Sequence, residues 1–425
     1  MPGLSGRRAV RAGLLLVLAA AAAVLALRHG QHTAREAATA AFLQRHWAHP
    51  IAAQGEPPRR FSATEASLAP QACGSCHVAQ YADWQTSLHS RTVGPGLLWQ
   101  LRTFDQANGN ACLRCHAPLA EQRALTALER GWPNAPAGVP PGYVPPDLHR
   151  QGLVCAACHV RQHQRHGPVP QEGRPQPHPD LPHGGYVAEP AFSDSRFCST
   201  CHQFEPDGRR VNGKLLQDTY EEWRTSPAAA AGQTCQSCHM PQRRHLWRGI
   251  HDPATVAQAL RREITVQRLD GERIRVDVAL VNAGAGHHLP TYVVPKIQVS
   301  VLLQGERPML NRRLATHRIG RVLDTALSAE SADTRLAAGA RHAMAIETAA
   351  GAGRWQVVLR TEVAPAEHYE RMFAEMDARH PEFDDTTRAL LRQAGQAAVA
   401  ARYRLPDTVV EVPARAGDPV RVVAN

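Results

Sequence analysis

The stretch Cys73-Gly74-Ser75-Cys76-His77 decides how this chain folds, because it is the first of five copies of one pattern, C-x-x-C-H. The other copies are Cys112/Cys115/His116, Cys155/Cys158/His159, Cys198/Cys201/His202 and Cys235/Cys238/His239. The pattern is the attachment signature of c-type haem, in which two thiols bond to the porphyrin and the adjacent histidine binds the iron. The sequence therefore predicts five covalently bound haem c groups with their iron atoms.

Zinc sites and disulfide bonds are the other common uses of paired cysteines. Zinc ribbons also contain C-x-x-C pairs, and two such pairs can share one metal. Five pairs would leave one pair without a partner, and neither chemistry requires a histidine after every second cysteine. Because histidine is only 23 of 425 residues, five such coincidences are not expected by chance. Haem attachment is the interpretation that explains all five copies.

The composition fits a chain that surrounds large flat cofactors. Aromatic residues make up only 5% of the chain, and porphyrin rings would supply apolar surface that the side chains lack. The formal net charge is +10. Since haem carries acidic propionate groups, we interpret this basic excess as charge compensation rather than as a nucleic-acid-binding surface. We expect no nucleic acid among the partners.

The first thirty residues indicate export. Three arginines precede an uninterrupted apolar run at residues 12–27. Its length lies between that of a signal-peptide core and that of a membrane span, so residues 1–30 are predicted to be a signal peptide or an N-terminal membrane anchor. We favour an anchor in the cytoplasmic membrane, over residues 12–27. Both alternatives place the rest of the chain in the periplasm.

The motifs define the middle of the chain. Residues 31–60 are predicted to form a helix and a linker, and residues 61–261 a pentahaem cytochrome c domain. The first cysteines of successive motifs are 39, 43, 43 and 37 residues apart. Residues 81–87 are similar in sequence to residues 220–226, and both segments are predicted to be short helices beside a haem.

The pattern changes near residue 262, and residues 262–425 are predicted to form a β-rich domain. Two alternating runs, 263–269 and 273–281, are joined by Asp270-Gly271, a hairpin signal. Further strands are predicted at 293–303, 314–323, 341–347, 355–362 and 408–412, and helices at 366–378 and 386–403. The predicted fold class is α+β: a mostly helical and loop-rich multihaem module, followed by a small antiparallel β-sandwich-like module with C-terminal helices.

The sixth ligand of each iron is a functional question, because a second histidine closes the iron to small molecules and favours electron transfer. Five of the histidines outside the motifs are candidates by their local sequence: His89, His183, His287, His251 and His245. His251 ranks ahead of His245, and the group around His163 ranks below both. The sequence does not assign the distal ligands of the haems at Cys112 and Cys155.

The chain resembles the multihaem cytochrome c superfamily, and within it proteins built like the tetrahaem cytochrome c of ammonia oxidisers. The likeness rests on the first motif with Trp84 and His89, on CAACHVR at 155–161, CQSCHMP at 235–241, RGIHD at 248–252 and GHHLPT at 286–291. It covers residues 70–295. In such relatives stacked haem pairs carry electrons, and the resemblance implies that His89 and His287 are axial ligands.

The leading hypothesis is an electron carrier that joins a quinol-linked membrane complex to periplasmic or outer-membrane cytochromes, because five haems on one chain favour electron transfer. The alternative is a haem oxidoreductase that acts on a small nitrogen or sulfur compound at a five-coordinate haem. The chain has no C-x-x-C-K motif, the mark of the nitrite reductase active haem, and it lacks the haem number of octahaem oxidoreductases. A third hypothesis gives the β-rich domain a docking role. Asp384, Asp385 and the glutamates near Glu221 are interpreted as solvated helix-end charges.

Overall fold

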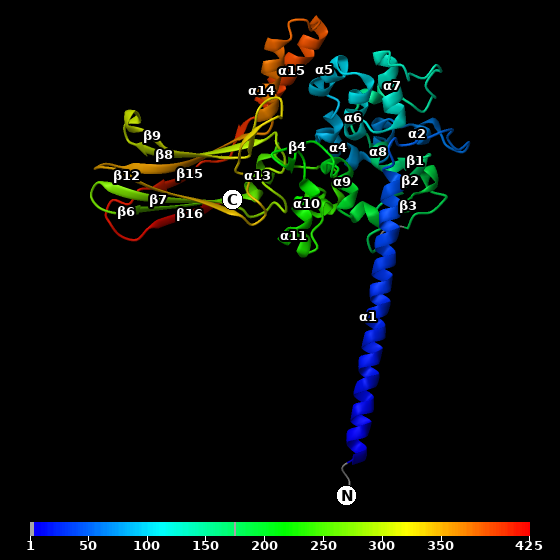
Figure 1. Cartoon of the computed structure of the whole chain (residues 1–425), viewed down its shortest axis with the longest axis horizontal. Helices are drawn as coiled ribbons and strands as arrows, with labels where there is room; N and C mark the ends of the chain where they lie inside the picture. The colour runs from blue at the N-terminus through cyan, green and yellow to red at the C-terminus, as the bar shows by residue number, and fades with distance from the viewer. Residues whose placement is uncertain (1–3, 174–175) are drawn as a thin grey trace.

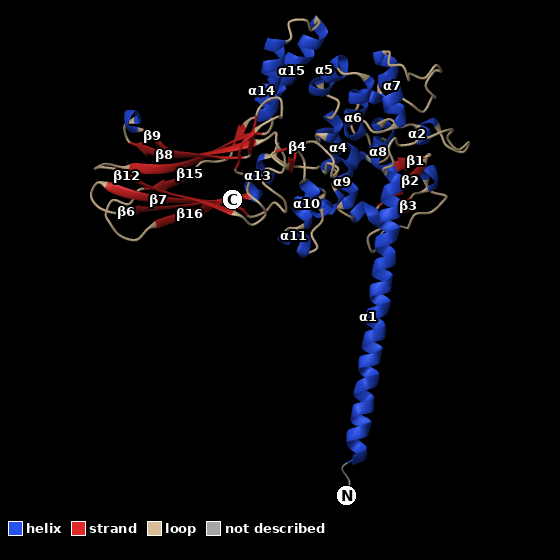
Figure 2. Ribbon diagram, viewed as in Figure 1, coloured by secondary structure: helices blue, strands red, loops and turns tan. Residues whose placement is uncertain are grey.

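A computed structural model describes residues 4–173 and 176–425, with side chains described from residue 18 onward except for residue 19. One long helix, α1 (Leu4–His46), projects from a globular body (Figure 1). The body has two parts: a mostly helical part at the base of α1, which we call the motif region, and a part built from two sheets, which we call the strand region (Figure 2). The predicted mixture of helices and antiparallel strands is confirmed.

Only the C-terminal end of α1 packs against the body. Phe42 and His46 are buried there, next to Phe192, and Glu36 forms an ion pair with Arg196 at 2.8 Å. Across the residues that the structure describes, no helix is apolar over a long enough stretch to cross a membrane. Part of the predicted anchor at residues 12–27 lies outside the described side chains.

Short helices make up most of the motif region. They are α2 (Ala63–Ala66), α3 (Pro70–Gly74), α4 (Val78–Thr86), α5 (Pro95–Thr103), α6 (Gln106–His116), α7 (Ala120–Arg130), α8 (Cys155–His159), α9 (Arg196–His202), α10 (Thr219–Arg224), α11 (Pro227–Ala230), α12 (Cys235–His239) and α13 (Pro253–Ala259). Between them lie the 3-10 turns η1 (His89–Arg91), η2 (Leu148–Arg150), η3 (Pro182–Gly184), η4 (Pro190–Ser193) and η5 (Pro241–Arg243), and the short strands β1 (Val160–Arg161), β2 (Gln164–Gly167), β3 (Val187–Ala188), β4 (Arg210–Val211) and β5 (Lys214–Leu215).

The spacing within the motif explains why it is helical. Residues three and four apart lie on one face of a helix, so a single turn brings both thiols and the histidine to the same side. Helices α6, α8, α9 and α12 each end at the histidine of their motif, and the first motif bridges the end of α3 and the start of α4.

The repeated sequence at 81–87 and 220–226 marks a repeated structure. Both segments form helices, α4 and α10, as predicted. The indole nitrogen of Trp84 donates to the carbonyl of Leu153, and that of Trp223 donates to the carbonyl of Gln233. Leu153 and Gln233 each lie two residues before the first cysteine of a motif. Each helix therefore anchors a later motif, the third or the fifth.

Two antiparallel sheets form the strand region. The four-stranded sheet has the order β12 (Arg341–Ala349), β7 (Arg273–Asn282), β6 (Leu260–Arg268) and β16 (Val420–Ala424); the five-stranded sheet contains β14 (Tyr403–Arg404), β13 (Trp355–Ala364), β8 (Lys296–Gly305), β9 (Arg312–Ile319) and β15 (Thr408–Glu411). A small pair, β10 (Arg321–Leu323) with β11 (Glu330–Asp333), and a turn, η6 (Pro308–Leu310), complete it. Buried residues alternate along β6, and one apolar cluster that includes Ile264, Val276, Val299 and Leu359 fills the space between the sheets.

Two ion-paired contacts are among those that join the strand region to the motif region. Helices α14 (Glu367–Arg379) and α15 (Asp385–Ala400) form a hairpin that lies beside α5 (Figure 1), where Trp99 packs with Phe373 and Arg102 pairs with Asp384 at 2.7 Å. Asp384 also caps α15, as expected of a helix-end charge. The second contact corrects the interpretation of the glutamates near Glu221. Glu222 is a buried acceptor that pairs with Arg335 at 2.8 Å.

We expect the second contact to weaken below about pH 4. Burial by itself would raise the pKa of the Glu222 and Asp333 carboxyls. Hydrogen bonds and charges from His288 and Arg335 outweigh burial at Glu222, and those from Arg335 and Lys214 outweigh it at Asp333, so both pKa values are lowered. A carboxylate whose folded pKa is depressed stabilises the fold above its unfolded pKa, and that stability is lost as the pH falls through the folded value. Thermal unfolding between pH 7 and pH 3 checks this. The acid-dependent loss should be smaller in Glu222→Gln, and an equal loss in both proteins would contradict the assignment.

Candidate haem-binding site

Four of the five motif histidines face a second histidine across a gap of nearly constant width. The ring centroids are 6.2 to 6.4 Å apart in each pair. The pairs are His77 with His183, His159 with His245, His202 with His89, and His239 with His287. Rings in direct contact would lie closer together, so this spacing needs an explanation of its own.

The spacing matches that of two imidazoles bound to one metal ion. A metal–imidazole bond is about 2.0–2.1 Å long and the ring centre lies roughly 1.1 Å beyond the nitrogen, so the two ring centres are expected about 6.2 Å apart. The pair His239–His287 is also nearly parallel, at 9°. The residues present therefore fit haem iron with two axial histidines at four of the motifs.

Hydrogen bonds hold most of these imidazoles by their Nδ1 atoms. His159, His183, His239, His245 and His287 each place Nδ1 at 2.7 to 3.0 Å from a backbone carbonyl oxygen. A histidine that ligates a metal through Nε2 usually donates its other ring N–H in this way, which fixes the tautomer and the ring orientation. The Nε2 atoms are thus directed away from the backbone partners and toward the gap.

Burial favours the neutral form of six of the paired imidazoles, which is the form that binds metal. Burial is the largest cause of a lowered pKa at His89, to about 3, and at His159 and His202, to about 4. It also lowers the pKa of His183, His245 and His287. Each of these side chains can therefore offer a free electron pair at neutral pH.

The thiols bring the motifs together in a defined order. None of the ten cysteines, all of which the structure describes, forms a disulfide bond. The Cys155 thiol is the largest cause of the lowered pKa of Cys73, and the thiols of Cys201 and Cys198 have the same effect on Cys115 and Cys235, so the members of each pair lie close together. The first motif thus contacts the third, and the fourth motif contacts both the second and the fifth. Haems attached to these cysteines would lie in two adjoining groups.

The second motif differs from the other four. The Nδ1 of His116 lies 2.8 Å from the carbonyl of Thr92, but among the described residues no second histidine faces His116 at the spacing of the other pairs. Burial raises the pKa of Tyr369, on α14, and the Cys112 thiol raises it further, so α14 lies near this motif. The second motif is therefore the position where an iron would keep an open face.

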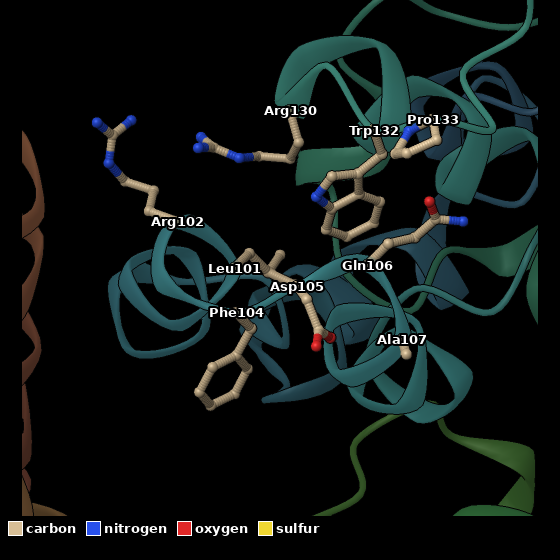
Figure 3. A pocket seen from close by; sticks show the side chains of 9 residues that line it. All are labelled: Leu101, Arg102, Phe104, Asp105, Gln106, Ala107, Arg130, Trp132 and Pro133. Carbon is tan, nitrogen blue, oxygen red and sulfur yellow. The ribbon is translucent and has the colours of Figure 1, made fainter.

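A surface hollow of about 580 Å³ lies beside the second motif, at the turn between α5 and α6. Arg102, Arg130, Phe104 and Trp132 are among the residues that line it, and none of its lining residues is a histidine or a cysteine. Figure 3 shows the side chains of Arg102 and Arg130 extending to the same side of the hollow. Trp132 also packs under α6, so the hollow shares a wall with the helix that carries the second motif.

Replacing Gly109 with alanine should destabilise the second motif. A Cβ at this helical position would lie 2.4 Å from the Trp132 ring. Glycine to alanine usually stabilises a helix by about 1 kcal/mol, but overpacking here reverses the sign, with an expected loss of about 1–3 kcal/mol. Urea unfolding measures the effect. Gly395→Ala on α15, where the nearest atom is 3.9 Å away, is the control and should be neutral or stabilising. A stable Gly109→Ala protein would contradict the packing.

The histidines outside the four pairs have other surroundings. His251 is exposed and, within the described residues, faces none of the motif histidines at the spacing of the pairs. The Nε2 atoms of His46, His149 and His163 already contact a carbonyl or carboxylate oxygen at 2.6 to 3.0 Å. Of the two candidates after the fifth motif, His245 therefore faces a motif histidine, whereas His251 faces none at that spacing within the described residues.

Strained backbone surrounds the histidine pairs. Eight described non-glycine residues have positive φ, and six of these lie within residues 162–183 or 242–247: Gln162, His163, His183, Gln242, Arg243 and Trp247. Such conformations are costly and persist mainly where the surroundings impose them, often at functional sites. Trp247 is the residue that sequence reasoning missed. Its position nine residues after Cys238 was the only available signal.

Comparison with known proteins gives one informative similarity. No family model matches the chain, and no curated protein matches it. Among solved structures, the chain is similar to a penta-heme cytochrome c552 from Thermochromatium tepidum, with a TM-score of 0.55 and 18% identity over 82% of this chain and 100% of that chain. The finer likeness to the tetrahaem cytochrome of ammonia oxidisers remains an interpretation of the sequence. Over most of its length this chain shares its fold with that penta-heme cytochrome.

Proposed function

We propose that this protein is a multihaem c-type cytochrome that transfers electrons through five covalently bound haems. The observation that carries the proposal is the set of four histidine pairs, each made of a motif histidine and a distant histidine 6.2 to 6.4 Å away. The shared fold with a protein described as a penta-heme cytochrome supports it.

The side chains have distinct tasks in this proposal. Each cysteine pair would hold one porphyrin through thioether bonds, and the adjacent histidine would bind its iron. Bound haem iron, alternating between ferric and ferrous states, supplies the electron transfer. At four motifs the facing histidines, His183, His245, His89 and His287, would occupy the second axial position. Because both axial ligands stay in place, the histidines would move little between the two oxidation states.

The location and the partners belong to the same proposal. Export by residues 1–30 would deliver the chain to the periplasm, where the haems are attached, and the apolar run at 12–27 would act as a signal peptide or as an anchor. The partners would be a quinol-linked membrane complex on one side and periplasmic or outer-membrane cytochromes on the other. The strand region would serve as a docking surface in addition to supplying His287.

Mass and spin state test the proposal. The protein, expressed with a working cytochrome c maturation apparatus, should carry five haems by intact mass. Electron paramagnetic resonance of the oxidised protein should show four low-spin ferric sites. A mass with fewer haems, or a spectrum in which most sites are high-spin, would refute it.

A second candidate function rests on the second motif. His116 lacks a facing histidine within the described residues, so an oxidoreductase that acts on a small nitrogen or sulfur compound would use this position. Five-coordinate iron gives a high-spin signal, and that signal should change when nitrite, hydroxylamine or sulfite is added. If the fifth site is low-spin and its signal does not change with any of the three compounds, the oxidoreductase hypothesis is excluded and the electron-carrier hypothesis stands.

A further inference from the structure

The indole of Trp247 lies edge-on against the facing histidines of two different sites. Its ring centroid is 4.6 Å from that of His89, at 70°, and 5.1 Å from that of His245, at 86°. His89 faces His202 of the fourth motif, and His245 faces His159 of the third. One side chain therefore contacts the facing histidines of two sites, those of the third and fourth motifs.

The two imidazoles depend on this contact to different degrees. The Nδ1 of His245 is 3.0 Å from the carbonyl of Arg243, which limits the rotation of that ring. The Nδ1 of His89 is buried and has no hydrogen-bond partner within the described part of the chain. Edge-on packing by Trp247 is thus the main restraint on the orientation of the His89 ring.

Trp247 is itself held in an uncommon conformation. Its φ angle is +44°, a value that non-glycine residues rarely adopt. The backbone N–H of Trp247 donates to the carbonyl of His239, and the Nδ1 of His239 in turn contacts the carbonyl of Arg248 at 2.7 Å. This reciprocal pair of bonds ties the segment to the fifth motif and imposes the backbone angle.

The other side of the segment is tied to α4. Asp83 accepts two hydrogen bonds from the guanidinium of Arg244, at 2.6 and 2.7 Å, and one from the backbone N–H of His245. The Arg248 side chain donates to Thr86 at 3.0 Å. Trp247 therefore sits on a segment that is anchored both to the helix after the first motif and to the fifth motif.

We propose that Trp247 is a positioning residue that sets the ring orientations of His89 and His245 together and so couples the third and fourth sites. The inference rests on the proposed function, because both histidines are taken as axial ligands. Since the Nδ1 of His89 has no hydrogen-bond partner within the described residues, whereas that of His245 has one, the fourth site should respond more strongly to loss of the indole than the third.

Low-temperature electron paramagnetic resonance tests the proposal, because the g-values of low-spin haem depend on the angle between its axial imidazole planes. Trp247→Leu should shift two low-spin signals, one strongly and one weakly. Trp247→Phe, which keeps an aromatic edge, should shift the same two signals less. His89→Ala identifies the strongly shifted signal, because that signal should be the one it removes. Trp355→Phe, in the strand region, is the control for loss of a tryptophan and should leave every signal unchanged.

The outcomes separate the two proposals. If the unmodified protein carries no haem by mass, the proposed function fails. Suppose that the unmodified protein and both Trp247 variants each carry five haems. If the g-values of the variants then equal those of the unmodified protein, the positioning role is refuted and the proposed function stands. If Trp247→Leu does not mature, Trp247→Phe decides: a shift confined to the two signals supports the role, and unchanged g-values overturn it.

Discussion

Replacing His287 with alanine is expected to turn one low-spin ferric site into a high-spin site that binds cyanide, with all five haems still attached. Attachment would depend on Cys235 and Cys238, which the substitution does not touch. The imidazole of His287 lies 6.2 Å from that of His239 and within 9° of parallel, and its Nδ1 contacts the carbonyl of His288 at 2.8 Å. Only the Nε2 atom of His287 is then available to occupy the sixth position of the iron, so loss of the imidazole should leave that position vacant.

His251→Ala is the matched control for this experiment. His251 has the same chemistry and was also a predicted ligand, but it is exposed. Its loss should leave the spectrum and the cyanide response unchanged. Intact mass confirms haem content in both variants, and titration with cyanide at constant protein concentration counts open sites. A low-spin His287→Ala protein, or a new high-spin site in His251→Ala, would reverse the two assignments.

Local patterns were predictable because they depend on neighbours in the sequence. The i, i+3, i+4 spacing of the motif predicts one helical turn, and four helices end at a motif histidine. Alternation predicts strands at 263–269 and 273–281, which the structure extends to β6 and β7. The last strand, β16, was missed because it pairs with β6, which lies more than 150 residues earlier in the chain. Such pairing leaves little local signal.

The histidine pairs could not be predicted, although all four facing histidines were among the five candidates named from the sequence. His89 follows the first motif closely, yet it faces His202 of the fourth. His245 follows the fifth motif, yet it faces His159 of the third. Which histidines pair depends on the path of the loops that bring distant segments together. The positive φ angles within residues 242–247 show that tertiary contacts, rather than local backbone preference, impose that path. Trp247 was missed for the same reason, because its role exists only once two distant histidines meet.

Glu222 and Glu221 show how burial separates adjacent residues of one type. Both lie on α10 and were predicted to be solvated. Glu222 is 5% exposed, accepts hydrogen bonds from the backbone of His288 and the hydroxyl of Thr291, and pairs with Arg335, which is 7% exposed. Glu221 is 43% exposed and pairs only with Arg224 on its own helix. The contacts of Glu222 attach residues 286–291, which include His287, to the motif region. The ion pair of Glu221 lies within one turn of α10.

Glu222→Ala should therefore cost about 1.5–3 kcal/mol of stability, because it removes the charged hydrogen bonds to Arg335, Thr291 and the backbone of His288 while Asp333 still pairs with Arg335 at 2.9 Å. Glu221→Ala should cost less than about 1 kcal/mol. Loss of Glu222 should also loosen His287, so a fraction of the fifth site should become high-spin although no ligand has been replaced. Denaturant unfolding followed in the far ultraviolet gives the stabilities, and the spin state of the same samples gives the second readout. Equal stabilities in the two variants, or an entirely low-spin Glu222→Ala protein, would show that the docking of the strand region does not depend on this buried pair.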